Sequence, residues 1–331
     1  MANLQAARPQ VGEQTATFAG RHAVACYFAL AFTISWLGAL AVIAPKLLRG
    51  LPVPKFAGLM MFPVMLLGPS IAGIVMTGTV DGKIGLNDLF SRMRNIRVRP
   101  RWYAAILIPP LTILCVLWPL AKLVSPVFGP NRFFVGASFG LIAGFCEEIG
   151  WTGFALPKMA RGGNALAAAA LLGVIWSLWH VPVVDYLGTS TPHGPYWLRY
   201  FLAFAAAMTA MRVLIAWVYV NTQSVVLAQL MHAGSTGALV VLSPAQVSAG
   251  QEAFWYAVYA AALWIIVMLV VRTFGKTLGS SAGRDHDLPR RGRGSVFQVD
   301  RKKISGSANI QSFKVSWFRG EPIACLRAWS L

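Results

Sequence analysis

Acidic residues are scarce in this chain: 11 Asp and Glu occur in 331 residues, against 29 Lys and Arg. Charged residues of either sign make up only 12% of the chain, about half the share found in soluble globular domains. This composition excludes an ordinary soluble enzyme. It also means that a carboxylate inside an apolar segment needs a partner, a proton or a task, because an ionised group in hydrocarbon costs several kcal/mol.

Cysteines are equally few. None of the four lies in a CxxC pair, so the sequence predicts neither a disulfide framework nor a cysteine-based metal site. The net charge of +18 is not accompanied by zinc-finger spacing or another nucleic-acid motif. Basic loops at a membrane face, together with a basic C-terminal segment, explain the charge. We therefore expect no nucleic-acid partner.

Apolar residues, by contrast, are abundant: 56% of the chain is hydrophobic and the mean hydropathy is +0.60. Apolar stretches of about 20 residues recur, each long enough to cross about 30 Å of hydrocarbon. The sequence predicts eight such spans, at about 22–45, 56–80, 102–125, 133–157, 164–187, 198–220, 225–243 and 252–271. The predicted fold is an all-α, polytopic transmembrane helix bundle, with the lipid bilayer as its first partner.

The two ends of the chain differ from this membrane domain, which we place at residues 22–275. Residues 1–21 are polar and contain no signal-peptide h-region, so the first span is expected to be an uncleaved anchor. Residues 276–331 are rich in Gly, Ser, Arg and Lys and are expected to form a basic, disordered tail. Basic residues, six of them in an amphipathic segment at 81–101, predict cytoplasmic termini and a bacterial-type cytoplasmic membrane.

A few ionisable residues stand at membrane depth in spite of this composition. Glu147 and Glu148 are adjacent in the fourth predicted span, and three further residues follow in the fifth to seventh spans: His180, Arg212 and His232. Ionisable residues inside membranes mark functional sites by default. Four consecutive spans thus predict one polar site in the bundle. His193, in a loop, is expected to be solvated.

These residue types suit hydrolysis. A glutamate in a partly dry cavity can act as a general base for water, and a nearby histidine can orient that water or donate to an oxyanion. Two histidines and a glutamate also match the ligand set of a hydrolytic zinc site. Glu148 and Thr152 are i,i+4 neighbours, so the hydroxyl can reach the carboxylate. Glu147 points about 100° away, which predicts a different role for it.

Three sequence segments carry a resemblance: Glu147-Glu-Ile-Gly-Trp-Thr-Gly-Phe, Trp176-Ser-Leu-Trp-His-Val-Pro and His232-Ala-Gly-Ser-Thr. In this order and on separate spans, they resemble the CPBP (CAAX protease and bacteriocin-processing, or Abi) family of intramembrane endopeptidases. That family's pattern is EExxxR, FxxxH and HxxxN on separate transmembrane helices. The similarity covers roughly residues 80–245. It implies hydrolysis of a peptide bond in a membrane-associated peptide.

The resemblance also implies roles. Glu147 is expected to activate water, with Glu148 as its support, while His180 and His232 orient the water and stabilise the oxyanion. If the protein is a metalloenzyme, the implied zinc ligands are Glu147, His180 and His232. The family resemblance leaves both the metal-free glutamate mechanism and the zinc mechanism open.

Three motif positions depart from the family pattern. Thr152 replaces the usual Arg, Trp176 the Phe, and Thr236 the Asn. A threonine offers one hydroxyl where an asparagine amide offers two donors and an acceptor. Arg212 is expected to supply the positive charge that Thr152 lacks.

Other functions remain open at this stage. A non-proteolytic immunity or scaffold protein could keep the fold without turnover, and a proton-coupled transporter could use the same carboxylates, although no repeated half is visible. The sequence also does not distinguish a CAAX-type lipidated peptide from a bacteriocin or leader peptide as the substrate.

Overall fold

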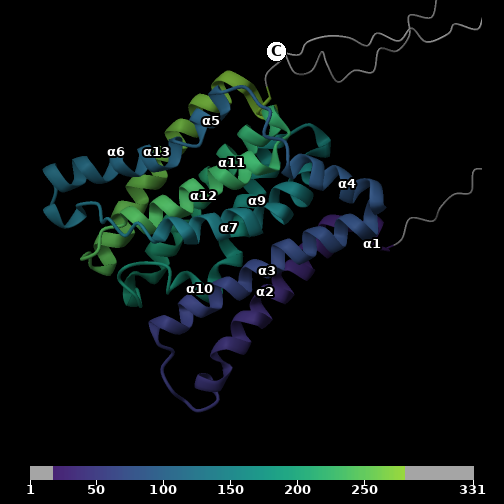
Figure 1. Ribbon diagram of the computed structural model, residues 1–331. Helices are drawn as coiled ribbons and strands as arrows, with labels where there is room; N and C mark the ends of the chain where they lie inside the picture. The colour runs from purple at the N-terminus through teal and green to yellow at the C-terminus, as the bar shows by residue number, and fades with distance from the viewer. Residues whose placement is uncertain (1–17, 280–331) are drawn as a thin grey trace, which may run out of the picture. The chain divides into compact units, whose positions relative to one another are not determined.

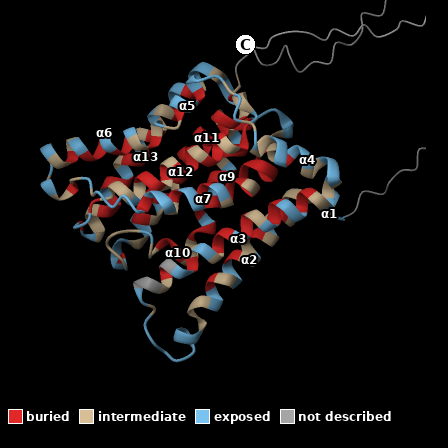
Figure 2. Cartoon of the chain, viewed as in Figure 1, coloured by how far each residue is buried: buried red, intermediate tan, exposed pale blue. Residues whose placement is uncertain are grey.

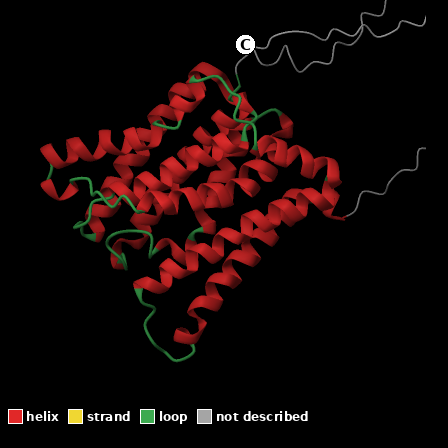
Figure 3. Cartoon of the chain, in the orientation of Figure 1, coloured by secondary structure: helices red, strands yellow, loops and turns green. Residues whose placement is uncertain are grey.

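The computed structural model describes residues 18–279, and every regular element within that range is a helix (Figure 3). The predicted all-α polytopic bundle is thereby confirmed. The predictions for the tail at 276–331 and for the segment at 1–21 concern residues that lie mostly outside the described range.

The longer helices follow one another with short connections (Figure 1). They are α2 (Ala23–Leu47), α3 (Lys55–Val80), α4 (Gly82–Met93), α6 (Ile108–Leu123), α7 (Gly136–Gly150), α9 (Ala165–Trp179), α11 (Trp197–Thr222), α12 (Val225–Leu242) and α13 (Ala249–Phe274). Four short α-helices lie between or before them: α1 (Phe18–Arg21), α5 (Arg101–Ala105), α8 (Leu156–Met159) and α10 (Val181–Val184). A π-helical turn, Trp151–Ala155, joins α7 to α8. Single 3₁₀ turns lie at Pro126–Phe128, Ala160–Gly162, Gly194–Tyr196 and Gly275–Thr277.

Within the described residues, six helical segments are long and apolar enough to cross a membrane: Ala23–Leu47, Met60–Val80, Arg101–Leu123, Gly194–Thr222, Val225–Leu242 and Ala249–Thr277. They coincide with six of the eight predicted spans, and the chain is an integral membrane protein. The other two predicted spans are the helix interrupted by the π turn, residues 136–159, and α9. At about 1.5 Å per residue, the 15 residues of α9 cover about 22 Å. Both are thus shorter or less regular than predicted, and both carry a sequence motif.

The bundle has a buried centre and a peripheral pair of helices (Figure 2). In the most apolar stretch of each span, 72% of residues are buried in α11 but only 22% in α2. Helix α11 packs against α9, α12 and α13, whereas α2 packs mainly against α3. Helix α11 therefore forms the centre of the bundle, and α2 lies at its edge with many apolar side chains exposed.

Glycines allow a close approach between helices α7 and α12. A Cβ atom added at Gly140 would overlap the carbonyl oxygen of Ala233, and one added at Gly144 would overlap that of Gln229. Since backbone atoms cannot move aside as a side chain can, only glycine permits this separation. The contact sets the sequence neighbours Glu147 and Glu148 directly against His232 on α12.

Polar groups fix the ends of these helices. Helix α11 ends where Gln223 adopts a left-handed conformation, φ 52°, and the Ser224 side chain accepts from the backbone N–H of Leu227 to begin α12. At the same end of the bundle, Arg92 of α4 donates to Tyr219 of α11 at 2.7 Å and to the Gly153 carbonyl at 3.1 Å. The amphipathic segment predicted at 81–101 thus includes a helix that is fastened to the bundle by a buried arginine stem.

Replacing Gly144 with alanine should lower the stability of the bundle by roughly 1–3 kcal/mol, the usual cost of overpacking a tight contact. The thermal unfolding temperature of the purified protein in lipid nanodiscs measures the change. Gly162→Ala is the matched control, because nothing lies within 4 Å of a Cβ at that position. Equal unfolding temperatures for the two variants would contradict the assigned role of Gly144.

Candidate functional site

Glu148 is the most heavily coordinated polar group in the bundle. Its carboxylate is fully buried and accepts from Arg212 Nη1 at 2.8 and 2.7 Å and from His232 Nδ1 at 2.7 Å. The Thr152 hydroxyl also donates to it, as the i,i+4 spacing predicted. Three helices and the π turn therefore meet on one carboxylate, and the charge of Arg212 balances that of Glu148.

Arg212 has few groups other than Glu148 that could balance its positive charge. It is fully buried on α11, and its guanidinium lies 4.3 Å from the centre of the Trp176 ring, in a cation–π contact. Within the described residues its Nε and Nη2 atoms have no hydrogen-bond partner. The positive charge of Arg212 thus lies against the Glu148 side chain. This is the charge that Arg212 is expected to supply because Thr152 replaces the arginine of the family pattern.

Glu147 lies beside this cluster but is held differently. Its Oε2 accepts from two indole N–H groups, Trp176 at 2.6 Å and Trp151 at 3.1 Å. Its Oε1 is buried without a hydrogen-bond partner in the part of the chain that is described, and lies 4.0 Å from Nε2 of His232. One oxygen is therefore fixed, while the other is left free opposite a histidine nitrogen.

The two histidines present one ring nitrogen each. Because a carboxylate only accepts, Nδ1 of His232 carries the proton that it donates to Glu148, and Nε2 faces Glu147. His180 follows the last residue of α9, and its Nδ1 donates to the carbonyl of Trp176 at 2.8 Å. Both imidazole rings pack edge-on against the Trp176 indole, at 5.3 Å for His180 and 5.0 Å for His232. The Trp176 side chain therefore contacts Glu147, Arg212 and both histidines.

The structure brings six predicted site residues into one connected cluster: Glu147, Glu148, Thr152, Trp176, Arg212 and His232. His180 adjoins this cluster through its contact with Trp176. Trp151 was not predicted as a site residue, although its i,i+4 spacing from Glu147 is a usable signal. Its position depends on the π turn, a feature that often marks functional sites.

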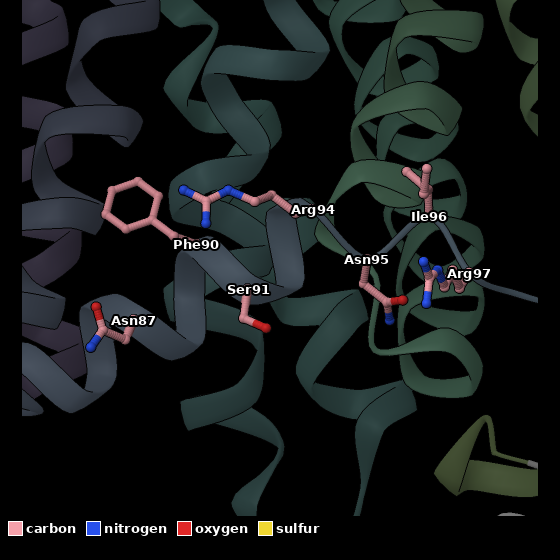
Figure 4. A pocket seen from close by; sticks show the side chains of 7 residues that line it. All are labelled: Asn87, Phe90, Ser91, Arg94, Asn95, Ile96 and Arg97. Carbon is pink, nitrogen blue, oxygen red and sulfur yellow. The ribbon is translucent and has the colours of Figure 1, made fainter. Parts of the chain in front are cut away.

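Thr236 is not in this cluster. It lies one turn beyond His232 on α12, and lines an apolar pocket of about 270 Å³ with Phe62, Phe139 and Tyr186. The pocket thus borders α12 one helical turn from His232. The larger pocket, about 690 Å³, is elsewhere, at the end of α4. Figure 4 shows its side chains, Arg94 and Arg97 among them, spread along the turn rather than converging.

His193 corrects one expectation. Predicted as a solvated loop residue, it is 1% exposed, because the loop folds back on α13 and places the imidazole between two carboxylates.

The donor set does not form a ready metal site. Among the residues that the structure describes, no three His, Cys, Asp or Glu side chains are grouped closely enough to hold a metal ion. In the three candidates from the resemblance, one oxygen of Glu147 and one nitrogen of each histidine are already engaged in the hydrogen bonds above. Zinc binding stays one of the two predictions that the resemblance leaves open, and the mechanism that we propose uses no metal.

Comparisons with known proteins agree with the family resemblance. Residues 129–238 match the family model described as type II CAAX prenyl endopeptidase Rce1-like. Over 165 residues, covering 44% of this chain and 58% of the relative, the sequence is 28% identical to CAAX prenyl protease 2 of Methanococcus maripaludis. Both matches support the assignment of the chain to the CPBP family. The segment matched by the family model contains all three CPBP motifs, from Glu147 to Thr236. The chain spans a little over half the length of this curated relative.

Arg212→Gln should destabilise this protein by about 3–5 kcal/mol, because it leaves the buried Glu148 carboxylate without a counter-ion. Thermal unfolding in nanodiscs measures the loss. Arg199→Gln, at an exposed position near the start of the same helix, is the control and should leave the unfolding temperature within a degree or so of the wild type. An unchanged unfolding temperature for the Arg212 variant would show that the ion pair does not hold the site.

Proposed function

We propose that this protein is an intramembrane endopeptidase that cleaves a CAAX-type or leader-type peptide at the membrane with a glutamate-activated water. The observation that carries the proposal is the asymmetry of Glu147. Its Oε2 is fixed by two indole donors, and its buried Oε1 has no hydrogen-bond partner within residues 18–279 and faces His232 Nε2 at 4.0 Å. A water between these two atoms can give up a proton to Oε1.

The proposed reaction uses each neighbour once. Glu147 takes a proton from the water as the oxygen attacks the peptide carbonyl carbon, and later gives that proton to the departing amine nitrogen. His180 accepts a hydrogen bond at Nε2 from the second O–H of the water and so orients the water for attack. His232, in its imidazolium form, donates from Nε2 to the oxyanion while its Nδ1–H stays on Glu148. Glu148 and Arg212 act through His232 and are positioning residues.

The substrate and the orientation are part of the proposal. The name of the relative, CAAX prenyl protease, supports a lipidated peptide, and the apolar pocket along α12 offers room for an apolar group. The exposed Arg94 and Arg97 at the end of α4 support a cytoplasmic position for that end, next to anionic headgroups of a bacterial-type cytoplasmic membrane.

Glu147→Gln should reduce cleavage by about 10²–10⁴-fold, the usual contribution of a general base, with an unchanged unfolding temperature. The measurement is release of the C-terminal fragment from a fluorescent farnesylated CAAX peptide, and from its unfarnesylated form, by the full chain in nanodiscs. Membrane peptide profiles with and without the chain extend the search to leader peptides. If the wild-type chain cleaves nothing in either assay and its fold is intact, a non-proteolytic scaffold replaces the protease.

Metal content provides a separate check on the mechanism. Elemental analysis of the active, purified protein should find less than one zinc per chain, and a chelator should leave cleavage unchanged. Stoichiometric zinc together with loss of cleavage on chelation would replace the metal-free step with metal-assisted hydrolysis.

Trp176→Phe should lower kcat by roughly 10–100-fold with a small change in KM, because one hydrogen bond to the charged Glu147 is lost. The phenylalanine ring keeps most of the apolar packing, so a collapse of the unfolding temperature is not expected. Trp179→Phe is a matched control, since its buried indole N–H has no partner in the described residues. Similar kcat losses in both variants would mean that packing, rather than the hydrogen bond, sets the rate.

A further inference from the structure

A second buried cluster of charged groups lies outside the CPBP motifs. His193 Nδ1 is 2.8 Å from Asp185 Oδ1, and its Nε2 is 3.3 Å from Glu252 Oε2. Glu252 is fully buried in the first turn of α13. Asp185 follows α10, only five residues after His180. We name Asp185, His193 and Glu252 the latch.

The latch ties a loop to α13. Glu252 accepts from the backbone N–H of Thr189 at 2.8 Å and from that of Ser190 at 2.8 Å. Asp185 Oδ1 also accepts from the backbone N–H of His193 at 2.8 Å. These three backbone N–H groups of the loop at residues 185–196 therefore all donate to one of the two latch carboxylates.

The same loop forms a wall of the apolar pocket. Tyr186 and Leu187 line it opposite Thr236 of α12, and Tyr186 packs so closely on Gly58 of α3 that a Cβ there would overlap the ring. The loop thus spans from the latch to the space one helical turn from His232.

Hydrogen-bond chemistry makes the latch depend on the charge of His193. A neutral imidazole has one N–H, so either tautomer turns a lone pair toward a carboxylate oxygen of Asp185 or Glu252. Only the imidazolium presents an N–H to each carboxylate, as a hydrogen bond to Asp185 and as an ion-pair contact with Glu252. The other groups that face the ring are Tyr200, stacked on it at 3.7 Å, and Tyr256 beyond Tyr200. These phenols remain neutral over the physiological range and leave the two carboxylates to decide the charge.

Burial alone lowers the pKa of His193, but hydrogen bonds and charge from Glu252 and Asp185 outweigh it and raise the pKa above the ordinary value. The direction in which pH changes the stability of the closed loop follows from the linkage between protonation and closure. A pKa that is higher in the closed loop than in the open one means that closure is favoured at acidic pH. That contribution is lost as the pH rises through the pKa of the closed loop.

We propose that the latch positions the loop at residues 185–196 as a wall of the substrate pocket, and that protonation of His193 holds this wall closed. Substrate entry into the pocket rests on the proposed function, whereas closure of the loop does not. His193 and Glu252 are positioning residues for that wall and take no part in the hydrolysis.

Hydrogen–deuterium exchange of the full chain in nanodiscs, without substrate, tests the closure between pH 5 and pH 9. After correction for intrinsic amide exchange, the protection of residues 186–190 should fall roughly tenfold as the pH rises, the effect of losing one hydrogen bond to a charged group. His193→Gln should remove this pH dependence. His22→Gln, a remote and exposed histidine, is the matched control and should keep it.

Protection that is equal at both pH values in the wild type, or a pH step that persists in His193→Gln, overturns the proposal. If His193→Gln does not fold, Glu252→Gln serves instead. It should lower protection at pH 5, because the side chain loses its negative charge and one of the two oxygens that accept from backbone N–H groups. Once cleavage is measured, the proposal also requires KM to rise with pH in the wild type but not in His193→Gln. Absence of cleavage would defeat the protease proposal and leave the exchange result standing.

Discussion

The contact on which the structure depends is the one between Glu148 and Arg212, deep among α7, α11 and α12. Two charges taken out of water stabilise a fold only if each finds its partner with good geometry. Here the carboxylate has three donors, and one of them is His232. The ion pair therefore does more than neutralise charge: it fixes the ring orientation of the histidine and so aims Nε2 at Glu147. The helix approach at Gly140 and Gly144 makes that distance possible.

The two adjacent glutamates show how one helix produces unequal carboxylates. Glu148 faces a cation, a hydroxyl and a histidine, and all three bind it as an ion. Glu147, about a quarter-turn away, faces two indole N–H groups and a free space. Indole can donate but cannot take up a proton, so the two tryptophans orient Glu147 without competing for the proton that a base must carry. Trp176 in the position of the family's phenylalanine thus adds a function to the packing role of the ring.

Much of the fold and the site followed from the sequence, for identifiable reasons. Apolar runs of about 20 residues predict membrane helices because hydrocarbon leaves the backbone no other way to satisfy its hydrogen bonds. Spacing predicted the Thr152 contact with Glu148. The π turn and the buried position of His193 were not predictable in this way. The position of His193 depends on a long-range approach of its loop to α13 that no local pattern records.

The departures from the family pattern also take on different weights in three dimensions. Thr152 donates to Glu148, and Arg212 brings to the same carboxylate the charge that a motif arginine carries. The function of the missing side chain is thus divided between a hydroxyl on the π turn and a guanidinium on α11. Thr236 has no such compensation within the polar cluster, since it lines the apolar pocket instead. In the proposed mechanism, oxyanion stabilisation is therefore left to His232. We expect the change at Thr236 to bear on which substrate fits, because Thr236 lines the pocket, while the change at Thr152 bears on how the charge of Glu148 is held.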